Sequence, residues 1–155
     1  MNEKFLTQAI EQAFDCVHKN KGGPFGAVIV QDGKVIGRGC NSVTSANDPT
    51  AHAEVMAIRD ACRNLQTFHL PDAVIYTSCE PCPMCLSAIY WAGIKTVYYG
   101  SDREDADRIG FSDKFIYDEL ALPPEKRLVA MIQLDVPLAK DLMKAWEEKQ
   151  DKIPY

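Results

Sequence analysis

Apolar residues recur at two spacings along this chain, and the alternation between them predicts its helices and strands. Across residues 3–19 the apolar positions repeat at helical spacing and fall on one face, which predicts an amphipathic helix. The stretch 27–41, AVIVQDGKVIGRGCN, holds two strand-like runs around Asp32-Gly33, a pair that favours a hairpin turn. A hairpin joins antiparallel strands, so a sheet that also holds strands linked through helices is mixed.

The residues after the hairpin continue the alternation of strands and helices. The expected elements are a loop at 42–50, a helix at 51–65, a strand at 73–78, a helix at 81–91, a strand at 95–100, short helices and loops from 101 onward, a fifth strand at 127–136 and a last helix at 138–150. This order predicts an α/β fold, a three-layer α/β/α sandwich with a five-stranded mixed sheet. Because no linker interrupts the pattern, we expect residues 1–155 to form a single domain.

The composition is that of an ordinary soluble domain. The 155 residues are 46% hydrophobic and 25% charged, and a chain of this length can bury a core without disulfide bonds. No apolar run approaches the ~20 residues of a membrane span, and the charged N-terminal pattern does not match a signal peptide. We therefore expect no membrane partner and a reduced, cytoplasmic setting.

The charge balance argues against a polyanionic partner. The formal net charge is −5, and no block of lysine or arginine stands out along the chain. Binding to nucleic acid depends largely on neutralising phosphates, so we expect no such partner, although net charge does not exclude a local basic patch.

Six cysteines are distributed unevenly along the sequence. Cys16 and Cys62 fall on the apolar faces of predicted helices, where we expect them to be buried as small hydrophobic residues. Three others stand within seven residues, in SCEPCPMC at 78–85, and this spacing indicates a different role.

Both candidate motifs lie where a strand or loop leads into a helix. Cys82 and Cys85 are three positions apart, so both side chains can reach one point near the start of a helix. His52 can supply a nitrogen from the start of the other helix. Three ligands of this kind leave a tetrahedral zinc ion one open position, which is typical of a catalytic site.

Glu54, two positions after His52, gives the site its chemistry. Zinc lowers the pKa of a coordinated water to roughly 7, and a neighbouring carboxylate can accept the proton and pass it to a leaving group. Taken singly, each residue has another interpretation: a helix cap for His52, a favourable helix-dipole charge for Glu54, and a redox pair or structural zinc half-site for the cysteines. The combination favours the catalytic metal site.

Cys79 is the main ambiguity, because it forms a second C-x-x-C pair with Cys82. A fourth protein ligand would make the site closed and structural. Cys79 precedes Glu80-Pro81 at the end of a predicted strand, so we prefer it as a non-ligand. A disulfide between Cys79 and Cys82 is disfavoured in a reducing compartment.

The motifs HAE at 52–54 and PCPMC at 81–85 resemble the signature of the zinc-dependent cytidine deaminase-like superfamily. The resemblance implies one zinc ion per chain on His52, Cys82 and Cys85, with Glu54 as the proton shuttle. It also implies hydrolytic removal of an amino group from a ring carbon, and a five-stranded sheet between helices.

Within this superfamily the chain most resembles the bacterial guanine deaminases, and the similarity runs nearly end to end. It includes GGPFGAVIV, YTSCEPCPMCL, AIYWA, GFSDKFIY and a terminal tyrosine. The implied reaction is guanine to xanthine plus ammonia, with hydrolysis at C2 and protonation of N3 by Glu54. Deamination of guanosine or another small nucleobase or nucleoside stays open, and editing of transfer RNA or a structural zinc module is less favoured.

The same resemblance implies roles for residues outside the metal site. Asn41 is expected to hydrogen-bond the purine, Phe25 and Trp91 to shape the base pocket, and Asp113 to face the edge that loses its amine. An ionised Asp113 can accept from N1–H and the 2-amino group of guanine but would repel the bare N1 lone pair of adenine. Alternatively Asn41 is a turn residue, Asp113 a helix cap, and Phe25 and Trp91 core residues.

The resemblance also implies a homodimer with exchanged C-terminal segments. Residues 137–155 are expected to cross to the partner subunit, where Tyr155 completes the partner's active site.

Overall fold

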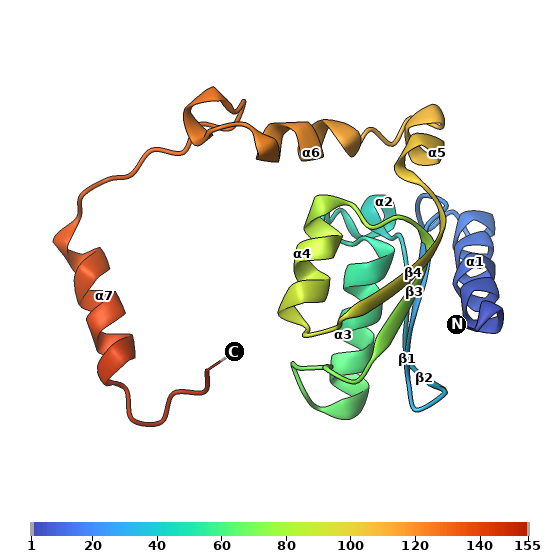
Figure 1. Cartoon of the computed structure of the whole chain (residues 1–155), viewed down its shortest axis with the longest axis horizontal. Coiled ribbons are helices and arrows are strands. Elements are labelled where there is room, and N and C mark those ends of the chain that lie inside the picture. Colours follow the sequence, from blue (N-terminus) through green and yellow to red (C-terminus); the bar gives the residue numbers. More distant parts are fainter. Residues whose placement is uncertain (1, 155) are drawn as a thin grey trace. The chain divides into compact units, whose positions relative to one another are not determined.

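A four-stranded mixed sheet, in the order β2-β1-β3-β4, forms the centre of the structure (Figure 1). The computed structural model of the chain describes residues 2–154. β1 pairs antiparallel with both β2 and β3, whereas β3 pairs parallel with β4. The strands are β1 (Gly26–Gln31), β2 (Lys34–Cys40), β3 (Val74–Cys79) and β4 (Thr96–Ser101).

The predicted hairpin is confirmed. Asp32 and Gly33, which join β1 to β2, have φ values of 50° and 71°. Positive φ at both central residues is what a two-residue hairpin turn with the twist of its strands requires, and glycine adopts it without strain.

Helices lie on both faces of this sheet, as the sequence predicts. Within the first half of the chain the short helix α2 occupies part of the stretch that we expected to be a loop. The helices are α1 (Glu3–His18), α2 (Val43–Ala46), α3 (Ala53–Leu65), α4 (Pro83–Trp91), α5 (Arg103–Arg108), α6 (Lys114–Ala121), the 3-10 helix η1 (Pro124–Lys126) and α7 (Pro137–Glu148).

Successive side chains of β1 point to opposite faces of the sheet, and each face is covered by helices. Ala27 and Ile29 pack into the apolar cluster beneath α3 and α4, while Val28 and Val30 pack against Phe5 and the rest of α1 on the opposite face. A strand whose two faces are both apolar is buried between two layers of helices, so the α/β sandwich is confirmed around four strands.

The contacts between residues divide the chain into two units, Met1–Tyr117 and Asp118–Tyr155. The first holds the sheet and the candidate site, and the second holds η1 and α7. The single domain expected for residues 1–155 therefore stays a prediction. No helix among the described residues is long and apolar enough to cross a membrane.

The fifth strand predicted at 127–136 is wrong for this structure. In the described chain these residues form no strand, and the large apolar side chains in the segment are exposed. A strand is stable only where its backbone groups pair with a neighbouring strand, and none of the described strands pairs with this segment. The segment has the apolar pattern of a strand without the backbone pairing that a strand needs.

Cys16 is buried, as expected, but it is not a free thiol. It forms a disulfide with Cys40, which joins the last turn of α1 to the end of β2, with the two Cα atoms 6.3 Å apart. The sequence did not predict this pairing, because the two residues are 24 positions apart and only the packing of α1 against the sheet brings them together. Cys62, which was also expected to be buried, is only partly buried.

Candidate metal centre

The starts of α3 and α4 present the predicted metal ligands. His52 immediately precedes α3 and Cys82 immediately precedes α4, and both have extended backbone, with ψ of 156° and 168°. Among the described residues neither side chain makes a capping hydrogen bond to its own helix. The alternative that His52 is only a helix cap therefore does not hold.

The three ligand atoms converge on one point. The Nδ1 atom of His52 lies 3.6 Å from Sγ of Cys82 and 3.5 Å from Sγ of Cys85, and all three atoms lie within 4.8 Å of one another. Tetrahedral bonds of about 2.3 Å to sulfur and about 2.0 Å to nitrogen place a sulfur and a nitrogen ligand roughly 3.6 Å apart. The residues therefore fit a tetrahedral zinc ion with one position left for water or substrate.

Interactions within the cluster favour a thiolate at Cys82. A hydrogen bond from Cys85 and the nearby His52 ring hold the pKa of Cys82 well below its usual range. In turn the hydrogen bond with Cys82 raises the pKa of His52. The hydrogen bond between the two thiols raises the pKa of Cys85. Zinc binds thiolates and a neutral imidazole, so metal binding would release the protons that the cluster holds on Cys85 and on the His52 ring.

Cys79 lies apart from this cluster. Its thiol donates to the backbone oxygen of Asp102 at 3.4 Å, and burial raises its pKa to about 11. A neutral thiol that is already hydrogen-bonded elsewhere is a poor fourth ligand. This geometry supports Cys79 as a non-ligand and leaves the metal site open.

Glu54, in the first turn of α3, is the buried acid beside the cluster. It is only 6% exposed, and burial raises its pKa to about 7, an effect that a hydrogen bond from Cys85 partly opposes. A carboxyl group with a pKa near neutrality can both accept and return a proton at physiological pH. The site thus combines a metal ligand set with a proton carrier.

Asn41 follows β2 and is buried, with its amide orientation fixed by two backbone donors. Its Oδ1 accepts from the N–H of Gly23 at 3.2 Å and from the N–H of Val43 at 3.3 Å. Since the carbonyl oxygen is occupied, the amide NH2 is the group that Asn41 can offer to a ligand. Gly22 permits this approach, because a Cβ atom there would lie 2.4 Å from Oδ1 of Asn41.

Asp113 supplies an acceptor that the protein does not use. Its Oδ1 atom is buried and has no hydrogen-bond partner among the described residues. Burial and the negative charge of Cys82 raise the pKa of Asp113, which places the carboxyl group in the field of the metal cluster. A buried acceptor without a partner is costly, so its retention points to a ligand that donates to it.

Phe25 packs against a residue that sequence reasoning did not single out. Its ring meets Phe111 edge to face, with the centroids 4.8 Å apart. Gly23 makes room for this pair, because a Cβ atom there would lie 2.8 Å from the Phe111 ring. The double glycine of GGPFG was the available signal, since it marks close approach of other groups to the backbone.

The structure does not bring Trp91 together with the other candidates in this chain. Trp91 ends the nine-residue helix α4, so it lies about 13 Å along the helix axis from Cys82 at 1.5 Å per residue. Its side chain is 68% exposed, so the alternative that it is a core residue does not hold either. Tyr155 lies outside the described residues, and both assignments stay predictions.

Comparisons with known proteins agree with this geometry. Residues 1–101 match the family described as the cytidine and deoxycytidylate deaminase zinc-binding region. Guanine deaminase from Bacillus subtilis is 49% identical over 154 residues, which cover 99% of each chain. A solved X-ray structure of that protein superposes with a TM-score of 0.96 over 100% of this chain and 99% of the other.

Two more distant relatives have different substrates from each other. Guanine deaminase from Nitrosomonas europaea has a TM-score of 0.69 at 28% identity, covering 73% of this chain and 65% of the other. The tRNA-specific adenosine deaminase from Haemophilus influenzae is 36% identical over 118 residues, or 76% of this chain and 68% of the other.

Proposed function

Because the chain belongs to the cytidine and deoxycytidylate deaminase family, we propose that it is a zinc-dependent aminohydrolase that converts guanine and water into xanthine and ammonia. The observation that carries this proposal is the convergence of His52, Cys82 and Cys85 beside the buried Glu54. A structural zinc module has four protein ligands and no use for a buried carboxyl group. The match to a guanine deaminase over 99% of the chain supports guanine as the substrate.

We expect His52, Cys82 and Cys85 to hold one zinc ion per chain. When bound, zinc acts as a Lewis acid that lowers the pKa of a water to about 7 and so supplies the nucleophile at neutral pH. The other residues of the site then have two tasks, which are to orient the purine and to carry protons.

Asp113 and Asn41 orient the purine in this proposal. The unpartnered Oδ1 of Asp113 accepts from N1–H and the 2-amino group, which lie side by side on guanine but not on adenine. The free amide NH2 of Asn41 donates to an acceptor on the base. Phe25 and Phe111 provide an apolar wall for the ring. A site built from such polar groups rejects a base that leaves them unpaired.

Glu54 carries the proton. Its raised pKa allows it to accept a proton from the attacking water and to deliver it to N3 of the purine. The same carboxyl group then assists protonation of the amine at C2, which leaves as ammonia. The balance is one water consumed and one ammonia released, with xanthine as the product.

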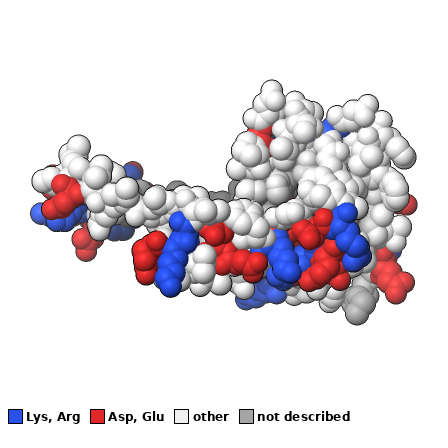
Figure 2. Space-filling view, turned by 90° about the horizontal axis from the view of Figure 1, so that it is seen from above, with Lys and Arg blue, Asp and Glu red and all other residues white. Residues whose placement is uncertain are grey.

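A nucleic-acid substrate is the second candidate, favoured by the similarity to tRNA-specific adenosine deaminases. The charge distribution argues against it. The net charge is −5, and on the face drawn in Figure 2 basic and acidic side chains of the described residues are intermixed without a continuous basic area. Binding of RNA phosphates needs such an area.

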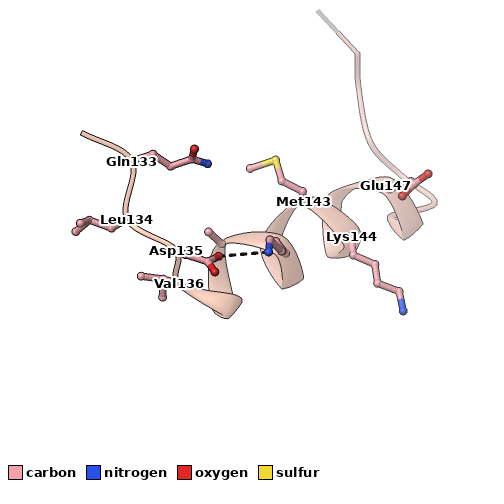
Figure 3. A pocket seen from close by; sticks show the side chains of 9 residues that line it. Gln133, Leu134, Asp135, Val136, Met143, Lys144 and Glu147 are labelled. Carbon is pink, nitrogen blue, oxygen red and sulfur yellow. Dashed lines mark ion pairs between the residues drawn. The ribbon is translucent and has the colours of Figure 1, made fainter. Parts of the chain in front are cut away.

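The second unit of the chain supports a dimer. Its extended segment 128–136 and α7 expose apolar side chains, including Leu128, Ile132 and Leu142. Residues 133–136 and α7 border a hollow of about 590 Å³. Figure 3 shows Leu134, Val136 and Met143 among its lining, together with polar side chains such as Asp135 and Lys144. None of the proposed zinc ligands lines this hollow. The exposed apolar side chains of the second unit are typical of a protein interface.

We therefore propose a homodimer in which residues 137–155 of each chain pack on the partner subunit. On the first unit the edge strand β4 pairs on one side only in the described chain, so it can accept a strand from the partner's segment before α7. We also propose a cytoplasmic location, which the similarity to the Bacillus subtilis guanine deaminase supports, although the Cys16–Cys40 disulfide is unusual for a reducing compartment.

The test is ammonia release by zinc-loaded protein on a panel of guanine, guanosine, adenine, cytosine and an RNA anticodon stem-loop, with Glu54→Gln as the matched inactive control. Guanine is expected to react fastest. Preferential reaction of guanosine, cytosine or RNA would reassign the substrate, and no ammonia from any substrate would contradict the proposed activity.

A further inference from the structure

A polar network next to the metal cluster has no part in the proposed reaction. It begins at Glu80, two residues before Cys82, and runs to Arg103 at the start of α5. The side chain of Glu80 accepts from the backbone N–H of Arg103 at 3.2 Å and from Nε of Arg103 at 3.1 Å, and it also pairs with the Nη2 group. Arg103 is therefore held rigidly against the segment that carries a metal ligand.

Arg103 in turn holds Tyr117. The guanidinium carbon lies 4.1 Å from the centroid of the Tyr117 ring, a cation–π arrangement. The hydroxyl of Tyr117 donates to the backbone oxygen of Pro81 at 2.7 Å. The tip of this ring is thus attached directly to Pro81, next to Cys82, and its face is attached through Arg103 to Glu80.

Tyr117 also belongs to the helical turn that begins with Asp113. The backbone oxygen of Asp113 accepts from the N–H of Ile116 at 2.9 Å and from the N–H of Tyr117 at 3.4 Å. On the other side of Asp113 the chain is held by the N–H of Phe111, which donates to the backbone oxygen of Ala106 at 3.0 Å, and by the packing of Phe111 on Phe25. Asp113 is therefore fixed from both sides, and on the side toward the metal ligands it is fixed through Tyr117.

We propose that Tyr117 is a positioning residue, which with Arg103 and Glu80 fixes the Asp113 carboxylate relative to the metal ligands. Neither Tyr117 nor Arg103 is asked to touch the substrate. This inference rests on the proposed role of Asp113 toward guanine. It matters for rate because a misplacement of about 1 Å in a catalytic arrangement can cost about 100-fold.

Tyr117→Phe tests the hydrogen bond of the hydroxyl to Pro81 alone, because phenylalanine keeps the ring under Arg103. We expect kcat/KM for guanine to fall at least ~10-fold while zinc content and the thermal midpoint stay unchanged. Tyr98→Phe is the matched control, since Tyr98 stacks on Tyr76 away from this network, and it should leave kcat/KM unchanged.

A double-mutant cycle separates positioning from general destabilisation. If Tyr117 acts through Asp113, Tyr117→Phe should cause no further loss in an Asp113→Ala background. An equal loss in both backgrounds would overturn the proposal, because it would show that Tyr117 acts on something other than Asp113.

A second measurement does not depend on activity. In the zinc-loaded protein without substrate, amide hydrogen exchange at Ile116 and Tyr117 should accelerate about 5-fold or more in Tyr117→Phe, because the turn loses its anchor on Pro81. Unchanged exchange would overturn the positioning role even if the wild type proved inactive toward guanine. A wild type that releases no xanthine would instead overturn the proposed function.

Discussion

The Nδ1 atom of His52 lies 3.5 Å from Sγ of Cys85, although 33 positions separate the two residues in the chain. α3 and α4 lie on the same face of the sheet and share one apolar core, so the starts of the two helices meet. Along the chain, β3 lies between these two helices. A metal ion bound at their starts would link them directly. Loss of the metal should therefore affect both chemistry and stability.

Removal of a ligand is the first test. Cys85→Ala should abolish stoichiometric zinc binding and lower the thermal midpoint, because metal binding to a site formed only in the folded state stabilises that state. Zinc content by elemental analysis and thermal unfolding by circular dichroism measure the two effects.

Cys79→Ala is the matched control, since it removes a buried thiol three residues from Cys82 that is bonded to Asp102 instead. It should keep about one zinc per chain. Loss of zinc in Cys79→Ala would mean that the site is closed by a fourth ligand, and the catalytic interpretation would fail.

The close approach of Gly22 to Asn41 predicts a specific defect in binding. In Gly22→Ala the new Cβ atom would lie 2.4 Å from both Oδ1 and the backbone oxygen of Asn41, so Asn41 must shift. We expect the KM for guanine to rise about 10-fold, which corresponds to about 1.4 kcal/mol of binding, with zinc content unchanged.

Gly33→Asn controls for the loss of a glycine, because nothing lies within 4 Å of a Cβ atom there and asparagine tolerates its φ of 71°. Its KM should match that of the wild type. An unchanged KM in Gly22→Ala would show that Asn41 does not contact the purine.

The ion pair between Glu80 and Arg103 predicts a pH dependence of stability. The hydrogen bond from Arg103 lowers the pKa of Glu80 below its ordinary value of 4.5. A carboxyl group whose pKa is lower in the folded state stabilises the fold above the unfolded pKa, and this contribution is lost as the pH falls through the folded value.

The difference in unfolding free energy between the wild type and Glu80→Gln should therefore be constant above a pH of about 5 and shrink below about 4. Zinc ligands titrate in both proteins, so the difference isolates Glu80. A difference that is the same at both ends of this range would show that the ion pair contributes nothing through its charge.

The C-terminal segment should act in the partner's active site. Deletion of residues 151–155 should lower guanine turnover about 10-fold or more, with zinc content and thermal stability nearly unchanged, because a closing segment completes the pocket and excludes water. This predicted role includes Tyr155.

Mixing distinguishes exchange between subunits from closure within one. The truncated chain keeps Glu54, and a full-length Glu54→Gln chain keeps the tail, so a mixed dimer formed by co-refolding contains one complete site. Partial recovery of turnover is expected. A tail that acts on its own subunit would give a defect on truncation and no recovery on mixing.

Local sequence signals were sufficient for four strands of the sheet and for the proximity of two metal ligands. Asp32-Gly33 fixes a hairpin through its backbone preferences, and the alternating residues of β1 face two helix layers. Cys82 and Cys85 share one helix start, so their proximity follows from spacing alone. His52 was offered as a ligand from its place at the start of the other helix, and the recognised motif then implied the same ligand set.

Features that depend on distant contacts were missed. The segment 127–136 has the apolar pattern of a strand, but a strand also needs a partner edge, which the sequence of one chain does not specify. The Cys16–Cys40 bond and the attachment of Tyr117 to Pro81 each join elements whose packing no local pattern encodes. The resemblance to guanine deaminases implied that Trp91 shapes the base pocket. Its exposed position in this chain does not by itself support that role.

Formation of xanthine from guanine, followed by chromatography at equal zinc loading in the wild type and Glu54→Gln, tests the central claim most directly. The wild type should convert guanine into equal amounts of xanthine and ammonia, and Glu54→Gln should be slower by at least ~10²-fold. Near-normal turnover in Glu54→Gln, or no xanthine from the zinc-loaded wild type, would contradict the account.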